Sequence, residues 1–428
     1  MRVLRRWWHD TAGGLPASFW YLWAGILINR AGAFAMLFLS LYLTDARGAS
    51  EALAGTVVGA YGAGGAVGVL LGGVLADRWG RRATLLTAHL TTAGLMVALA
   101  LSQHLVLIAV LSALVGVVHS MPSPAFVAAI VDMVPEDRRA RAFNLQFWAF
   151  NLGMAVASLL AGVLAEASFL ALFLVDAGAT LATALVIAWK VPETLRRTVA
   201  SPRAVTATHG RRRPGLLTAL TDRIFLTFVG LTFLLAVLSM QTSTIMPLAM
   251  RADGLGPSAY GLVVALGGAL IVVGQLFVPR LIEGRRKDLV LAVSTGLMAV
   301  GFGALTVADA LGVYLAASVV WTVGSMLAAP PNAQINADLA PPELRARYQS
   351  VFYLTFPAAS FVAPTLGGVS LQYLGAAHWL IVGGLGLVAA AGHLLAGPPR
   401  ERRVAALRRK TAYADTDPTP TEDRVPAA

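Results

Sequence analysis

Long apolar stretches, each separated from the next by a short polar segment, dominate the pattern of this chain. A bilayer core of about 30 Å requires about 20 apolar residues in a helix, and stretches of that length occur repeatedly. The pattern predicts twelve membrane-crossing helices, at 17–44, 53–76, 83–103, 105–131, 142–165, 169–189, 224–250, 259–279, 289–308, 311–337, 349–373 and 379–397. A basic segment after the sixth helix divides them into two groups of six.

A repeated sequence relates the two groups. The segment DMVPEDRRAR, which starts at Asp132, returns in the same direction as DLAPPELRAR, which starts at Asp338, and the Gly-Arg-Arg of 80–82 returns at 284–286. Two like-oriented halves are typical of transporters in which one half rocks against the other. We therefore expect an all-α membrane protein with twelve transmembrane helices in two pseudo-symmetric six-helix bundles.

The polar segments set the domain boundaries. We expect the N-terminal bundle at 1–189 and the C-terminal bundle at 224–397, joined by a basic cytoplasmic linker at 190–223. The linker is rich in Arg and Pro, so it is not expected to form a compact domain. The polar, Pro-rich tail at 398–428 is predicted to be disordered.

Composition excludes several classes of protein. Hydrophobic residues make up 57% of the chain and charged residues only 13%, and the mean hydropathy is +0.70. Cysteine is absent, which rules out disulfides, thiolate catalysis and cysteine-based metal sites. The sequence shows no catalytic set, so we expect neither an enzyme nor a protein that holds a metal or a cofactor.

The distribution of basic residues predicts the orientation. Cytoplasmic loops retain Lys and Arg, and an N-terminus inside the cell puts all of them on that side except Arg30, Arg47 and Arg251. We expect a multi-pass protein of the cytoplasmic (inner) membrane with both termini in the cytoplasm and an uncleaved first helix. The net charge of +11 then reflects topology and attraction to anionic lipid, not nucleic-acid binding.

The most informative polar segment is GVLADRWGRR, from Gly73 to Arg82, between the second and third predicted helices. Gly80 permits a sharp reversal of the chain, and Gly73 would let a neighbouring helix approach closely. A carboxylate such as that of Asp77 gains ~0.3–2 kcal/mol at the amino end of another helix. The predicted gating motif consists of Gly73, Asp77, Arg78, Gly80, Arg81, Arg82 and Asp132.

Across its membrane region the chain resembles the major facilitator superfamily. The segment from Gly73 to Arg82 matches that family's signature in residue type and spacing, and Pro192-Glu193-Thr194 resembles a second family element. The segments ADRWGRR, PAFVAAIVD and NLQFWAFNLG are most similar to the bacterial multidrug-efflux branch, which exchanges substrate for protons.

The resemblance implies particular contacts for the motif. Asp77 would face the amino end of the eleventh helix, near Tyr348, and Arg81 or Arg82 would reach Asp132 at the inner end of the fourth helix. Such contacts would hold the cytoplasmic side shut and break when it opens. The alternative is a motif that determines topology and has no role in gating.

The repeat supplies a second, degraded copy of the motif. Arg285 and Arg286 are expected to approach Asp338, while no acid occupies the position equivalent to Asp77. Closure of the two halves should therefore be asymmetric.

The chain departs from the efflux branch in its intramembrane charges. Inside the twelve predicted helices only Arg30 and Asp176 are charged, and Gln146 and Ser325 lie where related multidrug exporters carry acids. Coupling through the usual carboxylates is therefore in question, and protons remain a candidate coupling ion.

Arg30 is the most informative single residue in the predicted helices, because it is charged. It lies about midway along the first one, where an unpartnered charge costs at least ~2.5–3.5 kcal/mol. Two interpretations are open. Arg30 forms a structural pair with Asp176 of the sixth helix, or it lines the cavity and attracts an anionic group of the substrate.

His119 is the other titratable candidate, one turn before Pro122 and Pro124 in the fourth helix. An imidazole can exchange protons near neutral pH, which would suit coupling. The alternative is a hydrogen-bonded histidine that serves packing. Pro330 and Pro331 occupy related positions in the tenth helix, and both pairs of prolines are expected to break their helices.

Amide side chains are expensive in lipid and should face protein or water. As a set they predict a cavity in the interior of the protein. Aromatic neighbours such as Phe147 and Trp148 would make that cavity suitable for an amphipathic molecule. For each amide alone, the alternative is packing between helices. The candidate substrate or coupling residues are Arg30, His119, Gln146, Asn151, Asp176, Gln241, Asn332 and Gln334.

These observations predict a secondary active transporter that exports small amphipathic compounds, drugs or metabolites, by alternating access. The shortage of internal carboxylates favours neutral or anionic substrates. Uptake of a small solute by a symporter or facilitator is the alternative, because fold alone does not decide direction. A membrane enzyme or receptor is disfavoured by the missing soluble domain. We expect a small-molecule substrate, a bilayer environment, no nucleic-acid partner and a monomer.

Overall fold

The computed structural model describes residues 13–33, 35–195, 217–274, 277–341 and 344–416. Within these ranges the chain is almost entirely helical and forms no strand. The linker predicted at 190–223 is described only at its two ends, and its arginine run at 211–213 lies outside the described residues. The tail beyond residue 416 lies outside them as well.

Six helical units make up the N-terminal half. They are α2 (Ala17–Ala31) followed by α3 (Leu39–Leu41) and a π-helical turn (Tyr42–Ala46), α4 (Glu51–Arg78), α5 (Arg81–Leu101), α6 (Leu105–Ser120) with α7 (Pro122–Met133), α8 (Glu136–Ala167) and α9 (Phe169–Lys190).

Six further units make up the C-terminal half. They are α11 (Arg223–Ala252), α12 (Pro257–Gly274), α14 (Lys287–Gly303) with a 3-10 turn (Ala304–Val307), α15 (Leu311–Leu339), α16 (Arg345–Tyr353) with α17 (Thr355–Leu374), and α18 (His378–Leu395). The short helices α10 (Leu217–Thr221) and α13 (Val278–Ile282) accompany them, and α19 (Gly397–Thr416) follows.

The described helices account for twelve membrane crossings. Ten helical stretches among the described residues are long and apolar enough to span a bilayer. The last of these, Arg347–Leu395, contains two crossings, α16 with α17 and then α18, and α2 with α3 forms the first crossing of the chain. The predicted number of transmembrane helices is confirmed.

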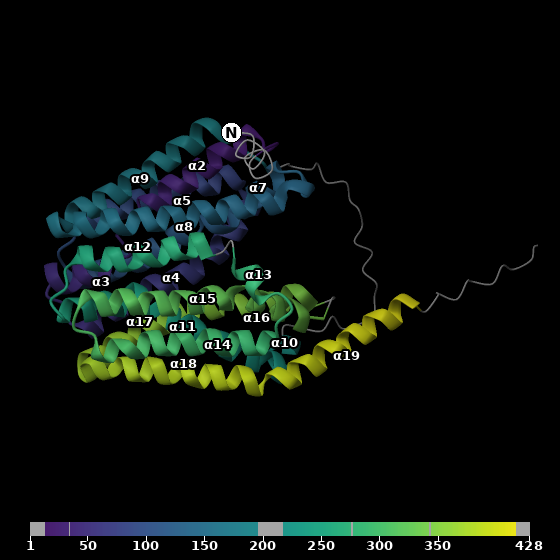
Figure 1. Cartoon of the computed structure of the whole chain (residues 1–428). Helices are drawn as coiled ribbons and strands as arrows, with labels where there is room; N and C mark the ends of the chain where they lie inside the picture. Colours follow the sequence, from purple (N-terminus) through teal and green to yellow (C-terminus); the bar gives the residue numbers. More distant parts are fainter. Residues whose placement is uncertain (1–12, 34, 196–216, 275–276, 342–343, 417–428) are drawn as a thin grey trace, which may run out of the picture.

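The two halves repeat the same packing order. In the N-terminal half, α2 packs against α8 and α9, α4 against α6, and α5 against α9. In the C-terminal half, α11 packs against α17 and α18, α12 against α15, and α14 against α18. Each contact in the second set is the counterpart, six crossings later, of one in the first. Figure 1 shows α2, α5, α7, α8 and α9 above and α11, α14, α15 and α18 below, while α4 and α12 lie between them. The repeated packing order confirms the predicted pseudo-symmetry.

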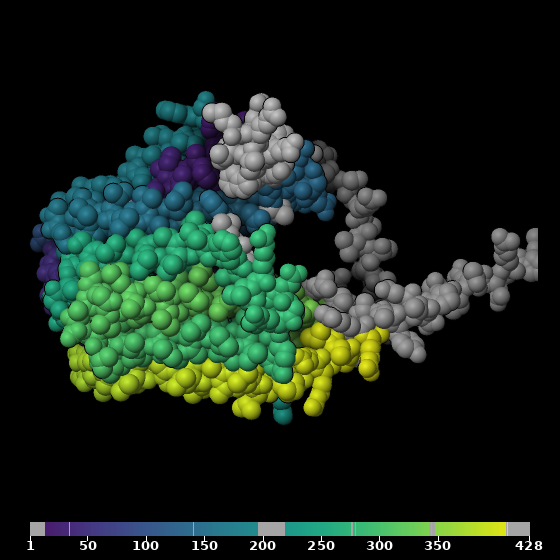
Figure 2. Space-filling model, in the orientation of Figure 1, coloured from purple at the N-terminus to yellow at the C-terminus, as the bar shows by residue number. Residues whose placement is uncertain are grey.

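The bundles meet at one end of the molecule and separate toward the other. The main contacts between them are α4 against α17 and α8 against α12. A Cβ added at Gly55, Gly59 or Gly62 would meet the backbone of α17, so these glycines allow the two helices to touch closely. All three lie in the half of α4 that begins at Glu51. We call this end of the molecule the opposite end, because it lies across from the end that carries Gly80. Figure 2 shows the surface hollowed between the bundles on the right, at the end that carries Gly80, which we call the motif end.

Several predicted helices differ in detail from the structure. The single helix predicted at 17–44 is wrong, because the chain leaves helical form after Ala31 and resumes it at Leu39. The break predicted at Pro122 is confirmed, since α6 ends at Ser120. The break predicted at Pro330 is wrong, because α15 continues through it between its neighbours α12 and α14, and packing of this kind supports proline in a membrane helix.

The predicted disorder of the tail is wrong for residues 398–416, which lie in α19 (Gly397–Thr416). This segment is rich in Arg and Ala, which favour helix. It is also tied to the bundle, because Arg403 Nη2 lies 3.4 Å from Asp222 Oδ2 at the start of α11.

The close approach expected at Gly73 occurs instead at its neighbour. A Cβ added at Gly72 would meet the backbone of Met121 at the end of α6, whereas a Cβ at Gly73 would meet nothing within 4 Å. The expectation for Gly73 is therefore wrong, because Gly73 lies on the side of α4 that faces away from α6.

These neighbouring glycines give a matched test of the packing. Gly72→Ala should destabilise the protein by ~1–3 kcal/mol, because the new methyl group has no room against a rigid backbone. Gly73→Ala serves as the control and should leave stability nearly unchanged. Thermal unfolding in detergent measures both, and equal losses of stability would contradict this packing of α4.

Candidate functional site

A charged cluster forms where α4 turns into α5. Gly80 makes the turn with a φ of +111°, a left-handed conformation that favours glycine. Arg81 follows as the first residue of α5, and its Nε lies 3.0 Å from Asp132 Oδ2 at the end of α7. Its Nη1 lies 3.5 Å from Asp77 Oδ1. Arg81, and not Arg82, thus makes the contact with Asp132.

The carboxylate of Glu193 caps the amino end of α5. It accepts hydrogen bonds from the backbone N–H of Arg81 at 2.9 Å and of Arg82 at 3.1 Å. Burial alone would raise the pKa of Glu193, but the backbone donors outweigh burial and hold the pKa below its ordinary value. Thr194 Oγ1 donates to Asp132 Oδ2 at 3.1 Å. The chain that follows α9 is therefore bound to both α5 and α7.

Glu193 and Thr194 were not among the residues predicted for the site, and Pro192-Glu193-Thr194 was predicted only to resemble a family element. A signal was present, because the residue directly before α5 is Gly80, which has no side chain to cap the helix. An acidic residue just beyond α9, at the same end of the bundle, is placed to supply the missing acceptor.

Asp77 does not face another helix in this structure. Its side chain is 76% exposed, and its partner is Arg81, four residues later across the turn. The predicted contact with the amino end of α16, near Tyr348, is therefore wrong for this conformation, because the two bundles are apart at the motif end. Arg78 is also exposed, whereas Arg82 Nη2 donates to the backbone carbonyl of Ala188 in α9.

The second copy of the motif uses a different cation from the one predicted. Lys287 Nζ lies 2.7 Å from Asp338 Oδ2, and Arg286 Nη2 instead lies 2.7 Å from Asp288 Oδ2. The expectation that Arg285 or Arg286 pairs with Asp338 is wrong. The turn before α14 is longer than the one before α5, so Lys287 occupies the first helical position that Arg81 occupies in the other half.

A cavity of about 290 Å³ lies between the two bundles, where α8 faces α11, α12, α14 and α15. We call it the central cavity. Its polar groups include Asn151 and Ser325, and among the described residues no charged side chain lines it. Apolar walls with a few polar groups are typical of small-molecule sites, and methionines adapt to varied shapes. The apolar surface includes Met154, Met246, Met298, Phe150, Phe302 and Trp321.

Arg30 lies beside this cavity. Its guanidinium carbon is 4.5 Å from the centre of the Phe150 ring, which lines the cavity. Asp176 is 2% exposed and serves the interrupted first helix, because its Oδ2 accepts from the Ala35 backbone N–H at 3.0 Å. Thr180 Oγ1 lies 3.5 Å from Asp176 Oδ1. Among the described residues no ion pair joins Arg30 to Asp176, so the direct pair considered from the sequence is not formed.

His119 lies within the N-terminal bundle. Its Nδ1 is 3.3 Å from the hydroxyl of Tyr61 on α4, and the two rings meet edge to face with centres 6.2 Å apart. His119 is not among the residues that line the central cavity. This geometry favours the packing interpretation of His119.

Two of the predicted amides bind neighbouring helices of their own bundle. Gln241 Oε1 on α11 lies 3.3 Å from His378 Nε2 on α18. Asn332 Oδ1 on α15 accepts from Thr232 Oγ1 on α11 at 3.0 Å. Both amides are buried, so the interpretation of each as a packing residue describes them.

The other three amides lie in different places. Asn151 lines the central cavity, although its Nδ2 also donates to the Phe147 carbonyl of its own helix at 2.9 Å. Gln334 is exposed and lines a separate cavity near Glu283 at the motif end. Gln146 is half-buried on α8. The structure therefore brings one of the five predicted amides into the central cavity.

Three polar contacts join the bundles at the opposite end. Arg251 of α11 forms an ion pair with Asp45, which follows α3. Ser258 of α12 donates both its hydroxyl and its backbone N–H to Glu166 of α8. The side-chain carbonyl of Gln372 on α17 accepts from the first turn of α4 at 3.1 Å. These contacts close the opposite end while the motif end is open.

The chain matches a protein-family model and is similar to known bacterial proteins. A family model described as Major Facilitator Superfamily matches residues 22–283 and 230–421. YttB, an uncharacterized MFS-type transporter of Bacillus subtilis (strain 168), is 26% identical over 366 residues, which cover 84% of this chain and 90% of YttB. The multidrug resistance protein MdtH of Klebsiella pneumoniae (strain 342) is 26% identical over 332 residues, which cover 74% of this chain and 79% of MdtH.

Solved structures show a similar fold. A peptide transporter POT in complex with sulfate has a TM-score of 0.74 at 18% identity, covering 91% of this chain and 96% of the other. At that identity the similarity concerns the fold alone.

The environment of Asp176 gives a test by double replacement. Asp176→Asn should destabilise the protein by ~1–3 kcal/mol, because the charge-assisted bond from the Ala35 N–H is weakened. Arg30→Gln should not restore this loss, and the effects of the two replacements should add within ~0.5 kcal/mol. Thermal unfolding in detergent of both single variants and the double variant measures the coupling, and rescue in the double variant would establish a direct pair instead.

Proposed function

The chain belongs to the major facilitator superfamily, and from this premise we propose that it exports small amphipathic compounds across the cytoplasmic membrane by alternating access, working as a monomer. The observation that carries the proposal is the cavity between the bundles, whose lining is apolar, rich in methionine and aromatic rings, and uncharged among the described residues. Export in preference to uptake is supported by the similarity to MdtH, which is named a multidrug resistance protein.

The proposed orientation has the motif end in the cytoplasm. Lys and Arg concentrate at that end, as expected for cytoplasmic loops. The structure then corresponds to the cytoplasm-open state of the cycle. Export requires the pairs Asp45 with Arg251 and Glu166 with Ser258 to separate, while Asp77 approaches α16 as the motif end closes.

The charge near the cavity favours neutral or anionic substrates. Arg30 holds a positive charge next to Phe150 at the cavity wall. Asp176 is the carboxylate that the sequence places inside the predicted helices, and it accepts a hydrogen bond from the backbone N–H of Ala35. A lipophilic cation would therefore meet repulsion without a compensating carboxylate. Protons are the proposed coupling ion.

Transport into proteoliposomes tests both substrate class and coupling. Neutral and anionic amphipathic dyes should move faster than ethidium-like cations, and an imposed pH gradient should drive them. Arg30→Gln should slow transport of the anionic dye about tenfold, as the loss of a charged hydrogen bond implies. Arg402→Gln, an exposed position on α19, is the control. Efficient export of cations with no transport of anions would contradict the charge argument.

Direction is tested separately in cells. An exporter should lower accumulation of the same dye, and an importer should raise it.

The opposite-end contacts provide a test of alternating access. The chain has no cysteine, so introduced thiols react without background. Glu166→Cys combined with Ser258→Cys, bridged by a short bifunctional thiol reagent, should stop transport, because α8 and α12 can no longer part. Cleavage of the bridge by a reductant should restore transport, and the two single variants treated in the same way are the controls. Undiminished transport by the bridged protein would exclude this movement.

A further inference from the structure

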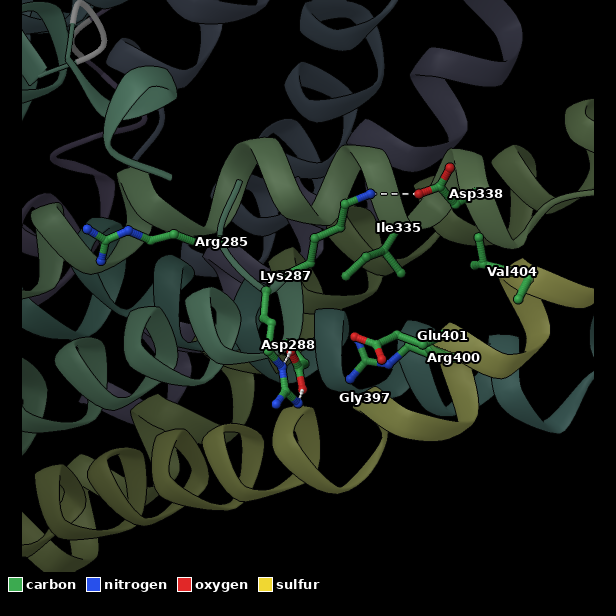
Figure 3. A pocket seen from close by; sticks show the side chains of 11 residues that line it. Arg285, Lys287, Asp288, Ile335, Asp338, Gly397, Arg400, Glu401 and Val404 are labelled. Carbon is green, nitrogen blue, oxygen red and sulfur yellow. Dashed lines mark hydrogen bonds and ion pairs between the residues drawn. The ribbon is translucent and has the colours of Figure 1, made fainter. Parts of the chain in front are cut away.

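A second charged site lies at the motif end of the C-terminal bundle. A cavity of about 430 Å³ opens there between the amino end of α14, the carboxyl end of α15 and α19 (Figure 3). Four cationic and three anionic side chains line it. The pair Lys287 with Asp338 and the pair Arg286 with Asp288 neutralise two of the cations. Arg285 and Arg400 have no carboxylate partner within 4 Å among the described residues.

Arg400 is the buried cation of this cavity. The residue is only 4% exposed, and its Nη2 donates to the His393 carbonyl at 2.8 Å while its Nε donates to the Ala396 carbonyl at 2.9 Å. Nη1 has no hydrogen-bond partner among the described residues. A buried guanidinium N–H without an acceptor is costly, so this atom marks a place for an anion. Figure 3 shows Arg400 and Glu401 side by side, entering the cavity from α19.

In the N-terminal bundle, the place that corresponds to this cavity is occupied by a carboxylate. There the pair Arg81 with Asp132 corresponds to Lys287 with Asp338, and the chain after α9 supplies the carboxylate of Glu193 to the amino end of α5. Among the described residues, no carboxylate from the chain after α18 accepts a hydrogen bond from the backbone at the amino end of α14, although Glu401 lines the cavity. The chain after α18 continues into α19 and brings a buried arginine to the equivalent position.

We propose that this cavity binds a phosphate group, carried either by an anionic lipid headgroup or by a soluble phosphate compound, with Arg400 as its direct ligand and the exposed Arg285 as a positive charge at the rim of the cavity. A guanidinium binds phosphate oxygens through two parallel hydrogen bonds, which suits a buried Arg400 better than a point charge would. The cavity is larger than a single carboxylate requires, and it lies at the charged ends of the helices, where headgroups are found. Glu401 opposes the ligand by charge repulsion.

Two binding measurements on the purified full-length chain in uncharged detergent separate the two sources. Native mass spectrometry with phosphatidylglycerol against phosphatidylcholine tests the lipid, and the shift in melting temperature with inorganic phosphate at fixed ionic strength tests the soluble compound. Preference for phosphatidylglycerol identifies a headgroup site, and stabilisation by phosphate identifies a soluble ligand.

The variants assign the binding to this cavity. Arg285→Gln should weaken binding, because it removes a positive charge from the rim of the cavity, and because Arg285 is exposed its replacement leaves the fold intact. Glu401→Gln should strengthen binding. Arg402→Gln, an exposed position on the same helix outside the cavity, should leave binding unchanged.

Three results would overturn the proposal. They are no binding in either measurement, an equal loss in the Arg402→Gln and Arg285→Gln variants, and weaker binding after Glu401→Gln, which would make Glu401 the partner of Arg400. Because Arg400 also caps α18, its own replacement is not needed for the test.

Discussion

Inside a bilayer no water is present to bind a backbone N–H or C=O group, and each unsatisfied group costs several kcal/mol. Every crossing of this chain is therefore helical, and an interruption requires a partner from elsewhere. After Ala31 the first crossing loses its helical form, and the carboxylate of Asp176 accepts the Ala35 N–H that the interruption exposes. The same constraint explains why a carboxylate lies deep inside the bundle, since it serves the backbone of a neighbouring helix.

Helices in lipid gain little from the hydrophobic effect, so close contact between small residues must hold them together. One helix, α4, carries two sets of glycines for this purpose. Gly55 and Gly62 belong to the set that touches α17 of the other bundle, and Gly68 and Gly72 belong to the set that touches α6 of its own bundle. The first set lies toward the opposite end and the second toward the motif end. A rocking movement can thus alter the contact between bundles while the N-terminal bundle keeps its internal packing.

The general architecture could be predicted because it depends on local and repeated patterns: apolar segment length, the sequence repeat, and a proline such as Pro122 that ends a helix. Features that depend on distant neighbours could not. Pro330 remains within a continuous helix because α12 and α14 flank it, and the role of Asp176 depends on a break that no proline marks. Lys287, and not Arg286, is the partner of Asp338 because the turn before α14 is longer than the turn before α5. Sequence alignment of the two halves does not reveal this difference in turn length.

The position of the charges suits the proposed alternation between two states. Ion pairs at the helix ends are reached by water, and exposed pairs contribute only ~0–1 kcal/mol each. Breaking a fully buried pair would cost ~3–5 kcal/mol and would trap one state. The pair of Asp45 with Arg251 and that of Arg81 with Asp132 are both partly exposed, at opposite ends of the molecule. Of the two pairs, only Asp45 with Arg251 joins the bundles, and a contact this weak can be broken by the differential affinity of a small molecule for the two proposed states.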